Sequence, residues 1–392
     1  MNNITVCVVS YNRPKSLIRI LNSLSQANYD NDKITLYISI DKDKNNSSEN
    51  QECFKIATDF NWNFGEKVVD YKKENLGLRK HILQCGCLTN EYENVIVFED
   101  DIVVSPDFYL YAKSALNFYN NDDRIAGFGI YSFPKNPANR LPFYPLNIGY
   151  DSYFMQYACS WGQMWTKKQW NLFYAWYKEN SDKDLHSDNF PDYIANWKDS
   201  SWLKYYMKYV VENNKYFVYP YNSYSTNFTD VGTHNKVSDI AFQTIISSNT
   251  KKFNFCSLDD SFAVYDVFFE NQKLNKILNI KDNVDVNFYN EKSSIKNKYL
   301  LTTQKLNYHI EKSYNLSMYP YEQNIINNVD GNDLFLYDTS IIETNKINTN
   351  FNLYNYLYRL GDMNKKEFIG LCKYLFSYGI NKFFNKIKKV FK

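Results

Sequence analysis

The sequence predicts an α/β protein built on a doubly wound, mostly parallel sheet. In about the first hundred residues, four β-branched, apolar runs alternate with segments whose apolar residues recur at helical spacing. The fourth run, residues 95–98, leads directly into three carboxylates, Glu99, Asp100 and Asp101. Right-handed crossovers between parallel strands bring the loops that follow the strands to one edge of the sheet. A functional site is therefore expected at that edge.

The secondary-structure elements are predicted in chain order from residue composition and from the residues that begin and end helices and strands. Pro14 lies at the start of the first helix, where its fixed φ is favourable, and Asp41 ends the second strand. The segment 42–50 is polar and is expected to be a loop, and 136–150 contains three prolines and is expected to be a long loop. The expected strands are residues 4–9, 36–41, 68–71, 95–98, 125–130 and 216–220. The expected helices begin near residues 14, 75, 108 and 202, and a further helix contains residues 170–177.

Composition limits the classes of function. The 392 residues allow about two to three domains. The formal net charge is +2, so no global field favours nucleic acid, and no nucleic-acid partner is expected. Seven scattered cysteines suit free thiols in a reducing compartment. The apolar start is too short for a signal peptide, and no run approaches the roughly 20 residues of a spanning helix. We expect a cytoplasmic protein.

The acidic triplet has two interpretations. It is either a solvated turn after a strand or an oxygen-ligand site for Mn²⁺ or Mg²⁺. Arg13, Asp41 and Arg79 follow other strands and are expected at the same edge. Such a mixture of acidic and basic groups suits a metal-bound nucleoside diphosphate, which favours the metal site over the turn.

Several motifs, in this order, resemble one family. The segments are residues 8–14, the Glu-Asp-Asp block within 98–108, Ser160-Trp161-Gly162, and 227–234, which ends in Gly232-Thr233-His234. They are similar to GT-A fold nucleotide-sugar glycosyltransferases, of the family 2-like and N-acetylglucosaminyltransferase I-like kind that build bacterial surface polysaccharides such as capsule or lipopolysaccharide. The resemblance covers roughly residues 4–240.

The resemblance implies roles for individual residues. Asp101 would bind the metal, Mn²⁺ or Mg²⁺, with His234 as a further candidate ligand. The implied donor-binding residues are Arg13 and Arg79 at the diphosphate, Asp41 at the base, Glu99 and Asp100 at the ribose and donor sugar, and Trp161 and Gly162 at the pocket wall. The implied general base is Asp199, with Asp192 and Asp188 as alternatives. Structural roles stay open: Arg79 as an exposed helix start, Asp199 as a helix N-cap and His234 as a hydrogen-bonding loop residue.

The implied activity is a metal-dependent, inverting transfer of a hexosyl or N-acetylhexosaminyl group. The donor would be a nucleotide sugar, with uridine diphosphate favoured by the resemblance, and the acceptor a hydroxyl of a glycan or lipid-linked glycan. A sugar nucleotidyltransferase is disfavoured because the loop 10–14 is not a Gly-rich, Lys- or Arg-bearing phosphate cradle. A non-catalytic sugar-binding protein on the same fold is the third hypothesis.

Three domains are expected. Residues 1–250 would form the GT-A catalytic domain, and 251–360 an accessory α/β region without a recognisable site. Residues 361–392 would form a basic amphipathic helix, because apolar residues near helical spacing alternate with lysines. Such a helix suits an anionic membrane surface, which would place the protein on the inner face of the plasma membrane, and docking onto the protein body is the alternative.

Overall fold

A computed structural model shows the architecture of the chain. It describes residues 4–228, 230, 240–248, 252–344, 369, 370, 372, 373 and 376. The chain divides into two compact units, Met1–Asn345 and Lys346–Lys392. In the second unit the five described residues are helical and exposed, and the rest of the predicted amphipathic helix over 361–392 lies outside the described residues. The predicted domain boundaries near 250 and 360 stay predictions.

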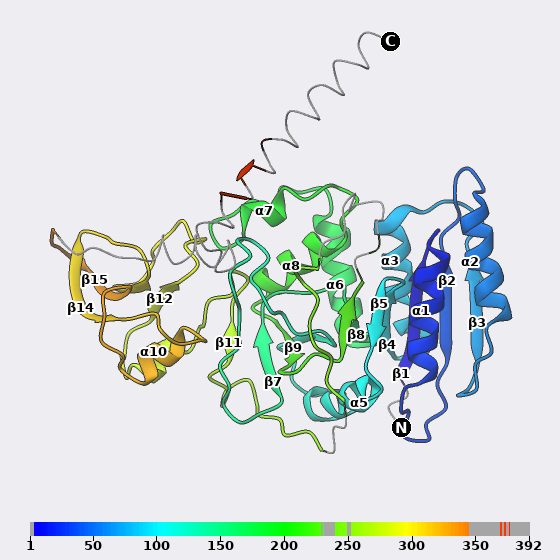
Figure 1. Cartoon of the computed structure of the whole chain (residues 1–392), viewed down its shortest axis with the longest axis horizontal. Helices are drawn as coiled ribbons and strands as arrows, with labels where there is room; N and C mark the ends of the chain where they lie inside the picture. Colours follow the sequence, from blue (N-terminus) through cyan, green and yellow to red (C-terminus); the bar gives the residue numbers. More distant parts are fainter. Residues whose placement is uncertain are drawn as a thin grey trace, which may run out of the picture. The chain divides into compact units, whose positions relative to one another are not determined.

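The first unit contains a large mixed sheet (Figure 1). In the described residues it has nine strands in the order β11-β7-β9-β6-β8-β4-β1-β2-β3. The strands are β1 (Ile4–Ser10), β2 (Leu36–Ile40), β3 (Lys67–Tyr71), β4 (Asn94–Glu99), β6 (Ile125–Gly129), β7 (Ser152–Met155), β8 (Gln163–Thr166), β9 (Tyr216–Pro220) and β11 (Val264–Tyr265). A separate two-stranded ribbon pairs β5 (Ile102–Val104) with β10 (Ser225–Asn227).

The prediction of a mostly parallel sheet is confirmed for one half only. Strands β3, β2, β1 and β4 are all parallel, as the strand–helix alternation predicted. Beyond β4 the sheet is mixed, because β8 is antiparallel to both β4 and β6, and β7 is antiparallel to β9. The short strands β7 and β8 were not predicted, since neither carries a run of β-branched residues.

Helices cover the sheet and follow from local sequence. In α1, Pro14 occupies the first turn, and the apolar stripe of Leu17, Ile20, Leu21 and Leu24 is fully buried. Helix α2 was expected to be partly a loop, because its sequence is largely polar. The helices are α1 (Pro14–Ser25), α2 (Ser48–Asp59), α3 (Gly77–Cys87), α4 (Thr89–Tyr92), α5 (Phe108–Tyr119), α6 (Lys167–Asn180), α7 (Asp192–Ala195), α8 (Leu203–Glu212), α9 (Leu274–Ile277) and α10 (Glu322–Ile326). No helix among the described residues has the length and apolar content needed to cross a membrane.

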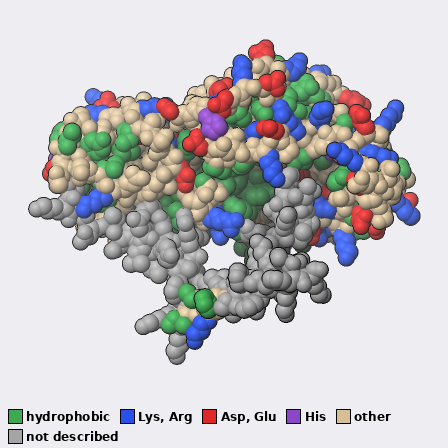
Figure 2. All heavy atoms as spheres, turned by 90° about the horizontal axis from the view of Figure 1, so that it is seen from above, with side chains coloured by type: hydrophobic (Ala, Val, Ile, Leu, Met, Phe, Trp, Pro, Cys, Tyr) green, Lys and Arg blue, Asp and Glu red, His purple; other side chains and the backbone are tan. Residues whose placement is uncertain are grey.

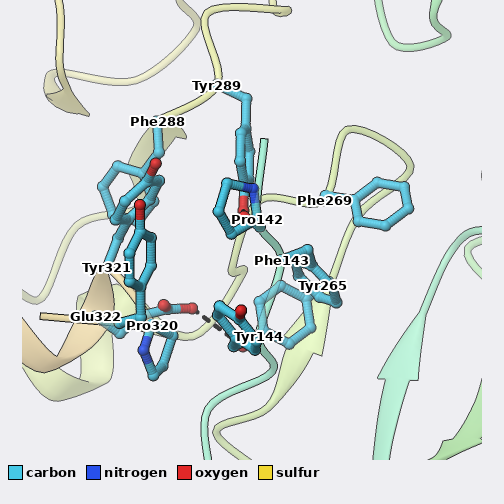
Figure 3. Close-up of a pocket in the computed structure, with 11 residues that line it drawn as sticks. Pro142, Phe143, Tyr144, Tyr265, Phe269, Phe288, Tyr289, Pro320, Tyr321 and Glu322 are labelled. Atoms are coloured by element: carbon cyan, nitrogen blue, oxygen red, sulfur yellow. Dashed lines mark hydrogen bonds between the residues drawn. The ribbon is translucent and has the colours of Figure 1, made fainter. Parts of the chain in front are cut away.

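The accessory region contains a four-stranded sheet in the order β12-β13-β15-β14, beyond β11 in Figure 1. Its strands are β12 (Val284–Asn287), β13 (Tyr299–Thr302), β14 (Tyr308–Tyr314) and β15 (Leu334–Ile342). Aromatic side chains from both regions surround a small cavity of about 10 Å³, and buried Glu322 accepts a hydrogen bond from the Tyr265 hydroxyl at 3.0 Å (Figure 3). Since Tyr265 belongs to the main sheet, the two regions share a packed interior.

Candidate functional site

A cleft of about 550 Å³ opens where β1, β2 and β4 end. Its position is the crevice outside the carboxyl ends of parallel strands, where open α/β sheets bind ligands. The described residues that line it are Val9, Ser10, Tyr11, Asn12, Arg13, Asp41, Lys44, Asn75, Gly77, Leu78, His81, Glu99, Asp100, Asp101, Trp161, Asn227, Phe228 and Asp230. The structure thus brings Arg13, Asp41, the acidic triplet and Trp161 together, as the convergence of strand ends predicted.

The acidic triplet is not a solvated turn. The Asp100 residue is only 2% exposed, and burial raises the pKa of its carboxyl to about 6. Burial, followed by the negative charge of Asp101, raises the pKa of Glu99 to about 8. The Ser10 hydroxyl donates to Asp100 Oδ2 at 2.8 Å. Carboxylates held this far from water require a positive partner.

Arg13 is the positive partner that the structure shows. Its guanidinium forms ion pairs with Asp100 and, at 2.9 Å, with Asp101 Oδ2. The Arg13 side chain does not cap α1, although the residue directly precedes that helix. The predicted location of Arg13 in the cleft is therefore correct, while its contact in this structure is with the acidic triplet.

The donor set fits a divalent cation. One oxygen of Asp101, Oδ1, is buried and has no hydrogen-bond partner among the described residues. A carboxylate oxygen is a preferred ligand of Mg²⁺ and Mn²⁺, which usually take one or two carboxylates and complete their shell with phosphates and water. Within the described residues no three or more His, Cys, Asp or Glu side chains gather as a ready-made metal cage. His234, the other predicted ligand, lies outside the described residues.

Asp41 lies in the cleft, but its carboxylate already holds the start of α3. Its Oδ1 accepts the backbone N–H of Leu76 at 2.8 Å, and its Oδ2 accepts that of Gly77 at 2.9 Å. Gly77 has a φ of +71°, which L side chains rarely adopt, so a glycine suits this turn. The observed contacts make Asp41 a positioning residue for the cleft wall, and its predicted contact with the nucleotide base stays a prediction.

Two predicted site residues lie outside the cleft lining. The Nε of Arg79 donates to the Tyr177 hydroxyl at 2.7 Å, and its guanidinium stacks over Tyr205 at 4.4 Å. Asp199 has a side chain that is 95% exposed and pairs with Lys204 at 3.1 Å. The side chain of Asp199, in the segment before α8, faces solvent. The predicted diphosphate contact of Arg79 and the predicted role of Asp199 as general base stay predictions.

The alternative bases lie in a different pocket. Asp188 and Asp192 line a pocket of about 440 Å³ together with Tyr193, Phe268 and Glu291, so this pocket joins the segment around α7 to the accessory region. No residue is shared between its described lining and that of the cleft.

Trp161 and Gly162 have different positions. The half-buried ring of Trp161 lines the cleft and packs edge-on against Tyr131 at 4.8 Å between centroids. Gly162 is buried below it with a φ of +99°, and an added Cβ would lie 2.7 Å from Phe98 Cε1. Gly162 thus permits the close approach of this loop to β4 and does not line the cleft.

Sequence reasoning missed several cleft residues. His81 is 2% exposed and its Nε2 lies 2.7 Å from Ser39 Oγ. Asp230 accepts a hydrogen bond from the Ser16 hydroxyl at 2.6 Å and pairs with Arg19. The segment 227–234 was singled out as a motif, but nothing in the sequence tells which of its side chains face the cleft.

Outside the cleft, charge is mixed. On the face shown in Figure 2, Lys and Arg side chains are interspersed with Asp and Glu, without a large area of one sign. This distribution agrees with the formal net charge of +2.

Comparison with known proteins gives distant likenesses only. No family model and no curated protein matches the chain. Among solved structures it is similar to S. aureus TarS 1-349, with 15% identity over 57% of this chain and 59% of that chain and a TM-score of 0.36. It is also similar to S. aureus TarS 1-349 in complex with UDP-GlcNAc, with 14% identity over 59% of this chain and 60% of that chain and a TM-score of 0.39. The match spans about three-fifths of those structures, and likeness at this level does not define a function.

Proposed function

We propose that this chain is a glycosyltransferase that uses a nucleotide-sugar donor. The observation that carries the proposal is the cleft itself. It places an acidic triplet with Asp100 buried and Glu99 and Asp101 half-buried, the guanidinium of Arg13, and an oxygen of Asp101 without a partner among the described residues at the carboxyl ends of β1 and β4. A nucleoside diphosphate needs positive charge around its phosphates, and carboxylates in the same place suit a bridging metal ion and the hydroxyls of ribose and sugar.

The proposed reaction is an inverting displacement at the anomeric carbon of the donor sugar. The bond from that carbon to the diphosphate oxygen breaks, the acceptor oxygen forms the new bond, and a general base takes the acceptor proton. A bound Mn²⁺ or Mg²⁺ would supply positive charge against the departing diphosphate. Arg13 supplies a fixed positive charge beside the same position.

The acceptor is proposed to be a hydroxyl of a glycan or lipid-linked glycan in bacterial surface polysaccharide synthesis. The proposed base stays Asp199, with Asp188 and Asp192 as alternatives: all three side chains are exposed, Asp188 and Asp192 line the pocket of about 440 Å³, and none of the three lines the cleft. The aromatic side chains of Tyr193 and Phe268 in that pocket offer apolar faces for sugar rings.

The test is donor turnover by the full-length chain. UDP-GlcNAc, UDP-glucose and GDP-mannose are each incubated with Mn²⁺, and release of the nucleoside diphosphate is measured. We expect slow release from one donor, and loss of that release in Asp101→Asn. Asp282→Asn, at an exposed position outside the cleft, is the matched control and should retain it. Pyrophosphate formation from UTP and a sugar phosphate, or donor binding without turnover in every acceptor mixture, would contradict the proposal.

A further inference from the structure

Two buried side-chain oxygens on the cleft wall lack hydrogen-bond partners. They are Asp101 Oδ1 and Asn227 Oδ1, and they are the unpartnered buried side-chain atoms among the described residues that line the cleft. Buried polar atoms in native structures are usually paired, so an unpaired oxygen that lines a ligand-sized cleft is available to a bound group. Asn227 had no role in the sequence-based site beyond opening the 227–234 motif.

Backbone pairing brings these two residues together across the chain. Strands β5 and β10 are antiparallel, with Asn227 opposite Ile102, the residue after Asp101. One residue further on, the backbone N–H of Phe228 donates to the Asp101 carbonyl at 2.7 Å. The backbone pairing therefore continues one residue past the start of β5 to Asp101, which lies in the turn before that strand, and both Asp101 and Asn227 line the cleft.

The chemistry of the pair indicates a cation. Both atoms are hard oxygen donors, one from a carboxylate and one from a neutral amide, which suits Mg²⁺ and Mn²⁺. Arg13 pairs with the other Asp101 oxygen, Oδ2, and so leaves Oδ1 available. The neutral amide adds a ligand without adding negative charge, and Arg13 lowers the net negative charge of the site. Affinity for the cation alone is therefore weak, and a diphosphate strengthens it.

We propose that Asn227 supplies the second protein oxygen, beside Asp101 Oδ1, to a divalent-cation site in the cleft. The inference rests on the proposed function only in using a nucleoside diphosphate as the co-ligand. The site takes two oxygens from the protein, and diphosphate oxygens and water complete its shell.

The test measures Mn²⁺ binding directly, by the electron paramagnetic resonance signal of free Mn²⁺, with and without UDP. We expect UDP to tighten Mn²⁺ binding by the wild-type chain, and Asn227→Ala to weaken that ternary binding by about tenfold or more. Asn227→Asp keeps the side-chain size and adds a charge, so it should tighten Mn²⁺ binding in the absence of UDP. Asn171→Ala, at an exposed position on α6, is the control and should bind as wild type.

Two results would overturn the inference. If Asn227→Ala and Asn227→Asp bind Mn²⁺ as wild type while Asp101→Asn does not bind it, Asn227 is not a ligand. If the wild-type chain binds no Mn²⁺ with UDP present, the site itself is refuted. Calorimetry of UDP binding and the donor-turnover assay report on the proposed function separately, since either can be positive without Mn²⁺ binding. Thermal unfolding of each variant shows whether the fold is intact, and Asn227→Asp tests the site even if the alanine variant unfolds.

Discussion

Replacing Arg13 with alanine should lower the free energy of unfolding by more than is usual for a residue that is partly exposed to solvent. The substitution leaves Asp100, whose side chain is 3% exposed, without its cation. Removing one partner of a buried ion pair costs about 3–5 kcal/mol, because the remaining charge stays desolvated. The Arg13 side chain is 25% exposed, so water replaces part of the lost interaction, and we expect a loss of about 3 kcal/mol in the free energy of unfolding.

Urea denaturation followed by tryptophan fluorescence measures this loss. With a slope of about 3 kcal/mol per molar urea, the midpoint of Arg13→Ala should fall by about 1 M. Arg124→Ala is the matched control, because Arg124 also pairs with two carboxylates, Asp122 and Asp259, but is 42% exposed. Its loss should not exceed about 1 kcal/mol, as for other surface pairs.

A double-mutant cycle identifies the cause. Asp100→Asn removes the buried charge and keeps an oxygen that can accept from Ser10. The double variant Arg13→Ala/Asp100→Asn should therefore be more stable than the sum of the two single losses predicts, since the residues interact directly. A midpoint for Arg13→Ala equal to that of Arg124→Ala, or strictly additive losses in the cycle, would refute the assignment of Arg13 as the counter-ion.

Three further predictions concern other sites. Asp199→Ala should retain donor turnover without acceptor within about twofold, because its side chain is 95% exposed, does not line the cleft and among the described residues pairs with Lys204 alone; loss of that turnover in a folded variant would contradict this. Burial raises the pKa of Glu270 to about 8, above its value in the unfolded chain, so the free energy of unfolding should fall as pH rises from about 4.5 towards 8. Urea midpoints measured across this pH range should show the fall, and the fall should be smaller in Glu270→Gln. Gly162→Ala should lower the free energy of unfolding by about 2 kcal/mol or more, because the added Cβ would lie 2.7 Å from Phe98. With a slope of about 3 kcal/mol per molar urea, a urea midpoint within about 0.2 M of wild type would contradict this prediction.

The prediction for Glu270 depends on its surroundings. Lys292 opposes the rise of its pKa and Asp266 supports it, while Glu270 Oε1 accepts the Tyr289 N–H at 2.8 Å and Oε2 has no partner among the described residues. The carboxyl binds a proton more readily in the folded than in the unfolded state. Ionisation therefore costs stability, which is why glutamine at this position should flatten the pH profile.

The sequence predicted the half of the site that local rules determine. Parallel strands end at one edge, so Arg13, Asp41 and the acidic triplet were expected together, and they line one cleft. The short strands β7 and β8 escaped prediction because they carry no apolar alternation of useful length. Because these two strands pair antiparallel to their neighbours, the sheet is mixed, and no local sequence pattern indicates this pairing.

The other half of the site depends on pairing between distant segments. Asp199 and Arg79 were assigned by their place in motifs, but tertiary contacts with Lys204, Tyr177 and Tyr205 hold both outside the cleft. Asn227 is the opposite case: it was given no role of its own, and it reaches the cleft because β10 pairs with β5. The register of such a ribbon is set by long-range packing, which a single sequence does not encode locally.

The acidic triplet shows why both halves are needed. A buried run of carboxylates requires positive charge, and the structure supplies one part of it from Arg13, which precedes α1. That pairing uses one oxygen of Asp101 and leaves Oδ1 buried without a partner among the described residues, as is Asn227 Oδ1 in the lining of the same cleft. Arginine alone therefore does not complete the site. The two remaining oxygens are available to a further ligand, and the cation proposed above is one that oxygen donors of this kind accept.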